Sequence, residues 1–225
     1  MALRASALTT PAGEVRLQDY RLRLAGREWS ILHTETVLSH EDEARYLGER
    51  DRLPYGLALW PAAIALAHDV AERGGALRGA RVLELGAGTG LPGIVASSFG
   101  AQVVQTDRQE LALAICAGNA RRNGVTEVEH RLADWATWDD DDSYDVILGS
   151  DILYAESMHE QLHGILERNL APGGRVLLSD PFRYKSMPLL ERLEAEGWAI
   201  TVSKWNLGSD VTPRPVGVFE LSRGL

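Results

Sequence analysis

The sequence predicts an α/β protein with a Rossmann-like, doubly wound and mostly parallel seven-stranded sheet. Between residues 81 and 222, short apolar runs alternate with longer helical stretches. Strands separated by helices of about 10–15 residues form crossover units, and such units build parallel sheets. The last two strands have no helix between them, and an alternating segment precedes the first crossover unit. We therefore expect an antiparallel C-terminal hairpin and an N-terminal β-hairpin extension.

The N-terminal part of the sequence divides into segments that differ in apolar content, charge and alternation. Residues 1–14 hold one arginine and little apolar length, which predicts a mobile leader without a secretory signal. Residues 15–24 and 27–34 alternate around Ala25-Gly26, which is typical of a β-hairpin, and the charged residues 41–53 predict a connector. The predicted division is a leader at 1–14, a hairpin with its connector at 15–54, and one folded domain at 55–225.

Local signals predict the elements of that domain. Pro61 stands just inside a helical stretch at 56–75, and Gly74 and Gly75 end it. The run "APGG" at 171–174 stops a later helix, and Asp139 to Asp142 predict a solvated turn. Further helices are predicted at 90–100, 108–124, 156–170 and 186–197, and strands at 81–85, 101–107, 125–135, 143–151, 175–180, 198–207 and 214–222.

Composition narrows the function classes. The formal net charge of −9 repels phosphate backbones, so we expect no nucleic-acid partner. No apolar run approaches the roughly 20 residues of a membrane helix, so we expect no membrane partner either. Cys116 is the single cysteine and can form no internal disulfide. A cytoplasmic monomer is the expectation.

The glycine loop within residues 81–94 spells G-x-G-x-x-G from Gly88 onward. This is the dinucleotide fingerprint, but its register is wrong, because glycine already follows the strand at Gly86. Pro92 falls between its last two glycines, and the Glu84 carboxylate would be a poor neighbour for a pyrophosphate. A carboxylate suits a cation, and S-adenosylmethionine carries a sulfonium and an ammonium without phosphate. Glu84 and the loop therefore predict S-adenosylmethionine more than NAD.

Two further strand ends carry acidic residues. Asp107 ends the second strand, where a carboxylate accepts hydrogen bonds from ribose hydroxyls of either NAD or S-adenosylmethionine. Asp134 and Trp135 end the third strand, where a carboxylate beside an indole can bind adenine by accepting from its amino group and by stacking. The three strand ends thus cover methionine, ribose and adenine in chain order.

The motifs "VLELGAGTGLPGI", "TDR" at 106–108, "ADW" at 133–135 and "LGSDILY" at 148–154 resemble the seven-β-strand (class I) S-adenosylmethionine-dependent methyltransferases. More narrowly, the chain resembles the protein-lysine methyltransferases of chaperones and of electron-transfer flavoprotein. That group shares an N-terminal hairpin and an "LWP" segment, here Leu59 to Pro61. The similarity covers about residues 15–222.

The resemblance implies roles for individual residues. Asp151 and Tyr154, a D-x-x-Y pair, would face the methyl-accepting pocket. The sequence departs from bacterial relatives at "SDPFRYKS", where Phe182 replaces an expected small residue and would reshape that pocket. The residues that the resemblance places against the cofactor are Trp60, Gly86, Ala87, Gly88, Asp107, Trp135 and Ser150.

The expected reaction moves a methyl group from S-adenosylmethionine to an accessible lysine of a protein substrate and leaves S-adenosyl-L-homocysteine. A lysine amine has a solution pKa near 10.4 and must lose its proton before it attacks. Asp151, at the end of the fourth strand, can orient the amine, and Tyr154 can form an aromatic wall that attracts a cation. Whether Asp151 acts as a base or only positions the amine is left open.

The sequence is also compatible with other functions. A small-molecule N- or O-methyltransferase shares the same core, and a cofactor-binding protein without catalysis is the non-enzymatic alternative. His159 to His163 spell H-E-x-x-H, the helix motif of zinc peptidases, but no third ligand follows, so we expect a solvated helix face and no metal.

Overall fold

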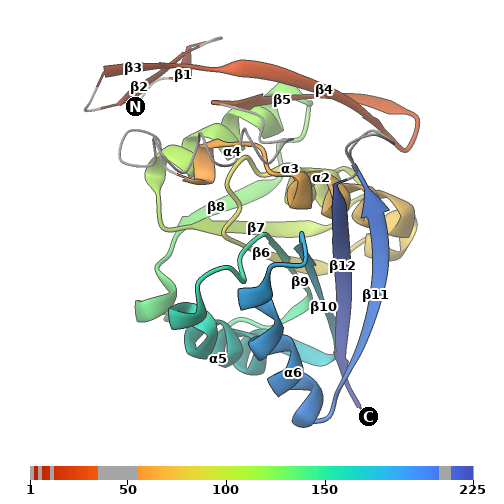
Figure 1. Cartoon of the computed structure of the whole chain (residues 1–225). Coiled ribbons are helices and arrows are strands. Elements are labelled where there is room, and N and C mark those ends of the chain that lie inside the picture. Colours follow the sequence, from red (N-terminus) through yellow and green to blue (C-terminus); the bar gives the residue numbers. More distant parts are fainter. Residues whose placement is uncertain (1–2, 5–6, 11–12, 35–54, 208–213, 225) are drawn as a thin grey trace.

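A computed structural model describes residues 3–4, 7–10, 13–34, 55–207 and 214–224. Its main sheet has seven strands in the order β11-β12-β10-β9-β6-β7-β8 (Figure 1). The five strands from β10 to β8 are parallel to one another, which confirms the predicted doubly wound fold. These strands are β6 (Arg81–Leu85), β7 (Gln102–Asp107), β8 (Val128–Leu132), β9 (Tyr144–Ser150), β10 (Leu170–Asp180), β11 (Trp198–Asn206) and β12 (Pro215–Arg223).

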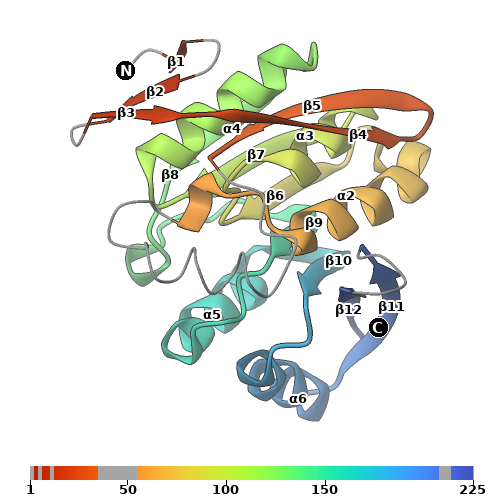
Figure 2. The ribbon, with the colours of Figure 1, turned by 45° about the horizontal axis from the view of Figure 1, so that its top comes forward.

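Helices cover both faces of this sheet (Figure 2). One face carries α2 (Pro61–Arg73), α3 (Leu91–Ser98) and α4 (Glu110–Arg122), and the other carries α5 (His159–Asn169) and α6 (Met187–Ala195). Side chains alternate along each strand, so Val82 joins the core under α2 and α3 while Leu83 joins the core under α5 and α6. Among the described residues, no helix combines the length and the apolar character needed to cross a bilayer.

The winding reverses at β6, which lies between β7 and β9. In open α/β sheets, ligands bind outside the carboxyl ends of the strands at such a reversal. The loops after β6, β7, β8 and β9 therefore surround the expected site. Short 3₁₀ turns occupy several connections, namely η1 (Tyr55–Leu57), η2 (Gly74–Leu77), η3 (Trp135–Thr137), η4 (Glu156–Met158) and η5 (Tyr184–Ser186).

The C-terminal strands form the predicted antiparallel hairpin, with β12 placed between β10 and β11. One boundary differs from the prediction, because β10 begins at Leu170 and includes the "APGG" run that was expected to be a stop. The register against β9 shifts between Leu170 and Arg175. Pro172 lacks an N–H and Gly173 has φ 75°, so the strand accommodates this run as an irregularity.

The N-terminal hairpin is also confirmed. Strands β4 (Gln18–Leu24) and β5 (Arg27–His33) pair antiparallel around Ala25 and Gly26, which both have positive φ. A separate three-stranded sheet contains β1 (Leu3–Arg4), β2 (Ala7–Thr10) and β3 (Gly13–Arg16). The expected connector at 41–53 lies outside the described residues, and the division into leader, hairpin and domain remains a prediction.

Two asparagines attach this hairpin to the domain. On α4, Asn119 accepts a hydrogen bond from the Leu32 N–H at 2.7 Å and donates to the Leu32 carbonyl at 3.0 Å. One turn later, Asn123 makes the same pair of contacts with the backbone of Ser30. Asn119 also donates to the carbonyl of Thr89 at 2.9 Å. The helix thus satisfies the open edge of β5 and joins the hairpin to the glycine loop.

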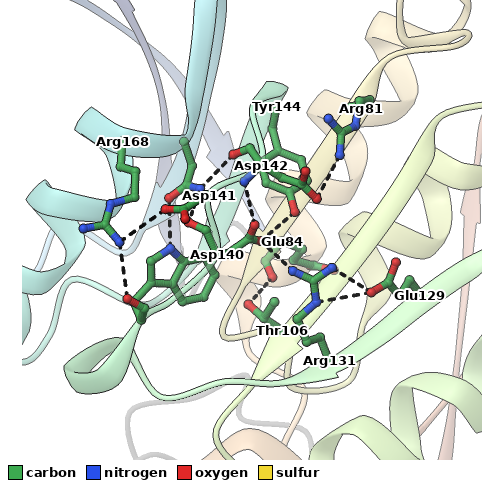
Figure 3. Close-up of polar contacts among 12 residues, drawn as sticks. Arg81, Glu84, Thr106, Glu129, Arg131, Asp140, Asp141, Asp142, Tyr144 and Arg168 are labelled. Atoms are coloured by element: carbon green, nitrogen blue, oxygen red, sulfur yellow. Dashed lines mark hydrogen bonds and ion pairs between the residues drawn. The ribbon is translucent and has the colours of Figure 1, made fainter.

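Part of the acidic run at 139–142 is buried and hydrogen-bonded to neighbouring residues (Figure 3). Asp141 is exposed as expected, but Asp140 is buried and accepts hydrogen bonds from Arg131 and from the Tyr144 hydroxyl, both at 2.7 Å. Burial, together with the neighbouring Asp140, raises the pKa of Tyr144. The prediction of a solvated turn was wrong for Asp140, because a buried tyrosine and an arginine supply donors that replace water.

Candidate active site

A cavity of about 250 Å³ opens where the winding reverses. It is lined by η1, the first turn of α2, and the segments that follow β6, β7, β8, β9 and β10. The structure thus brings together ten of the eleven residues that the sequence placed in the site. They are Trp60, Gly86, Ala87, Gly88, Asp107, Asp134, Trp135, Ser150, Asp151 and Tyr154.

The glycine loop presents bare backbone to this cavity. Gly86 and Gly88 have φ of 61° and 56°, a region that residues with a Cβ rarely adopt. A Cβ on Gly86 would lie 3.1 Å from Ile152 Cγ2, and a Cβ on Gly88 would lie 3.2 Å from the Gly56 carbonyl oxygen. A larger residue at either position would therefore strain the backbone and crowd these neighbouring atoms.

Glu84 is the predicted site residue that does not line the cavity. Its side chain is fully buried beneath the loop, where it accepts hydrogen bonds from the Gly93 N–H at 3.1 Å and from Gln105 Nε2 at 2.6 Å. Its backbone carbonyl accepts from the Thr106 hydroxyl (Figure 3). Burial raises the pKa of Glu84 to about 8. The geometry gives Glu84 a part in holding the start of α3 against β7.

Asp107 joins the glycine loop to the start of α4. One carboxylate oxygen accepts from the Gly88 N–H at 3.1 Å, and the other accepts from the Gln109 N–H at 2.9 Å. Burial raises the pKa of this carboxyl above its ordinary value. The side chain still lines the cavity, so it can accept a ligand hydroxyl while it shapes the loop.

Asp134 and Trp135 line the cavity beyond Asp107. Asp134 accepts a hydrogen bond from the Ala136 N–H at 2.9 Å and so caps η3. The Trp135 indole is partly buried and lies 3.5 Å from the position of a Cβ on Gly86. The indole and the Asp134 carboxylate thus offer an apolar surface and a hydrogen-bond acceptor at the same part of the cavity wall.

Asp151 lies at the opposite side of the site and is held by an arginine. Arg183 Nε and Nη2 each donate to one Asp151 carboxylate oxygen at 2.8 Å. Asp151 has φ 51°, and its N–H donates to the Ser179 carbonyl at 2.8 Å. Both Asp151 and Arg183 line the cavity. Sequence reasoning missed Arg183, although its place shortly after β10, the neighbour of β9, was a usable signal.

The aromatic residues of this region point in different directions. Tyr154 lines the cavity with 43% of its surface exposed, so it forms a rim. Phe182 does not line it, because its ring packs edge-on against Phe219 with centroids 5.9 Å apart and lies close to Gly217. The expectation that Phe182 reshapes the acceptor pocket is therefore corrected, and the segment brings Arg183 to the cavity instead.

The histidines of the H-E-x-x-H run do not converge. His159 is buried with Nε2 2.9 Å from the Leu153 carbonyl oxygen, while His163 contacts Glu196 on the C-terminal side of α6. Glu167 and Glu196 lie near His163, but Arg223 and Arg192 pair with these two carboxylates. The pattern is thus a helix with one buried and one paired histidine, and the expectation of a solvated helix face was wrong for His159.

Strand order, the glycine loop and the acidic strand ends define a class I S-adenosylmethionine-dependent methyltransferase. The magnesium protoporphyrin IX methyltransferase of Synechocystis with bound S-adenosylmethionine superposes with a TM-score of 0.59 at 16% identity, over 84% of this chain and 86% of that one. The ribosomal protein L11 methylase of Lactobacillus delbrueckii subsp. bulgaricus gives a TM-score of 0.58 at 25% identity, over 75% and 85%.

Residues 43–188 match the family model described as lysine methyltransferase, and the chain belongs to this family. The protein N-lysine methyltransferase METTL21A of Danio rerio is 37% identical over 80% of this chain and 75% of its own length. The METTL21A of Xenopus tropicalis is 36% identical over 60% of this chain and 64% of its own. The histone-arginine methyltransferase METTL23 of Mus musculus is 34% identical over 51% and 49%.

Proposed function

We propose that this protein transfers a methyl group from S-adenosylmethionine to a lysine side chain of a protein substrate. The observation that carries the proposal is that Asp151 and Tyr154 line the same cavity as the glycine loop and Asp107. Membership of the lysine methyltransferase family and the METTL21A relatives, which are named for lysine, support the same acceptor.

The cavity fits this cofactor by its chemistry. The glycine loop offers backbone without side chains, Asp107 offers acceptors for ribose hydroxyls, and Asp134 with Trp135 offers a carboxylate and an indole for adenine. Trp60 and Ser150 complete the proposed contacts. When bound, S-adenosylmethionine supplies an electrophilic methyl group. Glu84 acts from beneath the loop, because its carboxylate faces α3.

The acceptor side of the cavity has the groups that a lysine needs. Asp151 accepts a hydrogen bond from the amine and fixes its direction, and the Tyr154 ring provides a wall against the side chain. Holding the amine aligned within about 3–3.5 Å of the carbon that it attacks lowers the barrier through orientation. The lysine ammonium first passes a proton to solvent or to Asp151, which frees the amine lone pair for the new N–C bond. The carboxylate then stabilises the methylated ammonium until that group loses a proton to solvent.

The rim of the cavity favours a protein over a small molecule. A closed pocket lined by Phe182 and Tyr184 would suit a small acceptor, but neither residue lines the cavity. Tyr184 is 88% exposed, and Tyr154 stands at the opening. An open, aromatic rim supports an acceptor that remains attached to a larger molecule. We also propose a cytoplasmic monomer that does not act on nucleic acid. The charge of −9 opposes binding to phosphate backbones, and the single Cys116 is compatible with a reducing compartment.

The test uses the purified full chain, labelled S-adenosylmethionine and proteins of a cell lysate. We expect label in a protein band, recovered as methyllysine after hydrolysis. Asp151→Asn is the informative variant, since asparagine tolerates positive φ. It should lower the rate by roughly 100-fold or more and leave the affinity for S-adenosylhomocysteine unchanged. The exposed Asp141→Asn is the matched control and should keep wild-type activity.

Each contrary result has a distinct meaning. Label found only in small molecules would replace the protein acceptor by the small-molecule alternative. Cofactor binding without any transfer would indicate a binding protein, and full activity of the Asp151→Asn variant would remove Asp151 from the reaction.

A further inference from the structure

We propose that Arg183 is a positioning residue that fixes Asp151 and makes the site selective for an amine over a guanidinium group. This inference rests on the proposed function and names the determinant of its acceptor class. It starts from the paired contacts at 2.8 Å between Arg183 and both oxygens of Asp151. In this pair, the side-chain exposure is 6% for Asp151 and 27% for Arg183, so solvent screens the interaction only in part.

Arg183 is itself held in place by the segment after β10. Its backbone N–H donates to Asp180 Oδ1 at 2.6 Å, and the other oxygen of Asp180 accepts from the Ser186 hydroxyl. Phe182, just before it, has φ 60° and is anchored against Phe219. The chain therefore turns sharply on a buried carboxylate and an aromatic contact, and this turn aims the guanidinium at the end of β9.

The geometry of the pair determines what Asp151 can still bind. A guanidinium substrate is recognised best by two parallel hydrogen bonds to both oxygens of one carboxylate. Arg183 already occupies that face of Asp151. A carboxylate retains lone pairs beyond the two that such a pair uses, and an amine needs only one acceptor. A lysine amine can therefore share Asp151 with Arg183, whereas an arginine side chain would have to displace it.

The other carboxylates that line the cavity do not offer the two-oxygen face that a guanidinium acceptor would need. Asp107 accepts from the backbone N–H groups of Gly88 and Gln109, and Asp134 accepts from that of Ala136. Both belong to the side of the cavity assigned to the nucleoside. Among the described lining residues, Asp151 is thus the carboxylate available to an acceptor.

The first test needs no acceptor and compares crystal structures of the wild-type chain and the Arg183→Gln variant, each with S-adenosylhomocysteine. The wild type should keep the paired contacts, and the variant should show Asp151 rotated or in several conformers. An unmoved Asp151 in the variant would overturn the positioning role. Arg175→Gln, on β10 and paired with Glu220 at the surface, is the control and should leave Asp151 in place.

The second test measures transfer to lysate proteins. The Arg183→Gln variant should lose roughly 10- to 100-fold in rate at saturating cofactor, with an unchanged KM for the cofactor, and Arg183→Lys should recover part of the loss. In an Asp151→Asn background, Arg183→Gln should cause no further loss. A fully additive loss would overturn the proposal, because Arg183 would then act independently of Asp151.

The identity of the methylated amino acid tests the proposed selectivity for an amine over a guanidinium group. Hydrolysed protein from the wild-type reaction should contain methyllysine and no methylarginine, and methylarginine as the main product would overturn the selective role. Absence of any protein label would overturn the proposed function, while the two crystal structures would still decide whether Arg183 positions Asp151.

Discussion

At the scale of single residues, Glu84 has the most unusual environment. It is a carboxyl group with no exposed surface, and one of its oxygens, Oε1, has no hydrogen-bond partner within the described structure. Burial raises its pKa from an ordinary 4.5 to about 8, against the lowering effect of Gln105 and Gly93. The native protein therefore binds a proton here between pH 4.5 and 8 that the unfolded chain releases.

This difference predicts a pH-dependent stability. Because the folded pKa is the higher one, Glu84 contributes most to stability below pH 4.5, and this contribution falls as the pH rises to about 8. The Glu84→Gln variant cannot lose the proton. Its melting temperature relative to the wild type should therefore rise steadily from pH 5 to pH 8. A difference that stays constant over this range would show that Glu84 titrates normally. The exposed Glu129→Gln should show no such trend.

Two glycines in helices provide a matched pair of tests at the residue scale. A Cβ on Gly93 in α3 would lie 2.4 Å from Glu84 Oε2 and 2.8 Å from Gln105 Nε2. A Cβ on Gly164 in α5 would meet nothing within 4 Å. Denaturant unfolding should show Gly164→Ala stabilising by about 0.5–1 kcal/mol and Gly93→Ala destabilising by about 1–3 kcal/mol. Equal effects would mean that the contact with Glu84 relaxes without cost.

At the scale of elements, the attachment of the N-terminal hairpin depends on one helix face. Asn119 lies on α4, and Asn123 caps the C-terminus of this helix one turn later. Together they replace the neighbouring strand that the edge of β5 lacks. Because Asn119 is fully buried and makes contacts with both Leu32 and Thr89, it couples the hairpin to the glycine loop. The hairpin is thereby part of the support of the site.

The Asn119→Ala variant tests this coupling. It leaves the backbone groups of Leu32 and Thr89 without their partner, and each buried group left unsatisfied costs about 1–3 kcal/mol. We expect a lower melting temperature, and weaker S-adenosylhomocysteine binding by calorimetry, because Thr89 also lines the cavity. Asn206→Ala, at the end of β11 and distant in sequence from the loop, is the control for binding. Unchanged binding in Asn119→Ala would confine its role to the hairpin.

At the scale of the whole molecule, ligand binding should be visible as added stability. A ligand at 100 times its Kd stabilises the folded state by about 2.7 kcal/mol, which corresponds to roughly 5–10 °C for a chain of this size. S-adenosylhomocysteine should give this shift in a thermal melt, and NAD at the same concentration should give none. The reverse pattern would show that the loop binds a dinucleotide.

The fold was largely predictable from sequence, because the strands and helices have local signals. These signals are the periodicity of apolar residues and the glycines and prolines near the element ends. The cavity lining was predictable too, since residues such as Asp107 and Asp151 end parallel strands that meet at one edge. The direction of Glu84 was also accessible in principle. Side chains alternate between the two faces of a sheet, so Glu84 lies on the same face of β6 as Val82. That face packs under α2 and α3, away from the loop.

The remaining features depend on contacts between distant segments. Asp151 and Arg183 are 32 positions apart, and Asn119 and Leu32 are 87 apart. No periodicity records which side chains meet across such separations, because the meeting depends on loop paths and on backbone angles such as the positive φ of Phe182. The burial of Asp140 has a different cause, because its donors Arg131 and Tyr144 are only nine and four positions away. It was missed because a run of four aspartates was interpreted as a solvated turn from composition alone.

The position of β12 between β10 and β11 has a consequence for the order of events during synthesis. In the described sheet, the ladder partners of β11 all belong to β12, which leaves the ribosome later. The nascent chain therefore carries β11 with both edges open, and with the half-exposed Val202, until the following segment emerges. A chaperone that shields emerging strands would find its binding site in residues 198–206, and only for that interval.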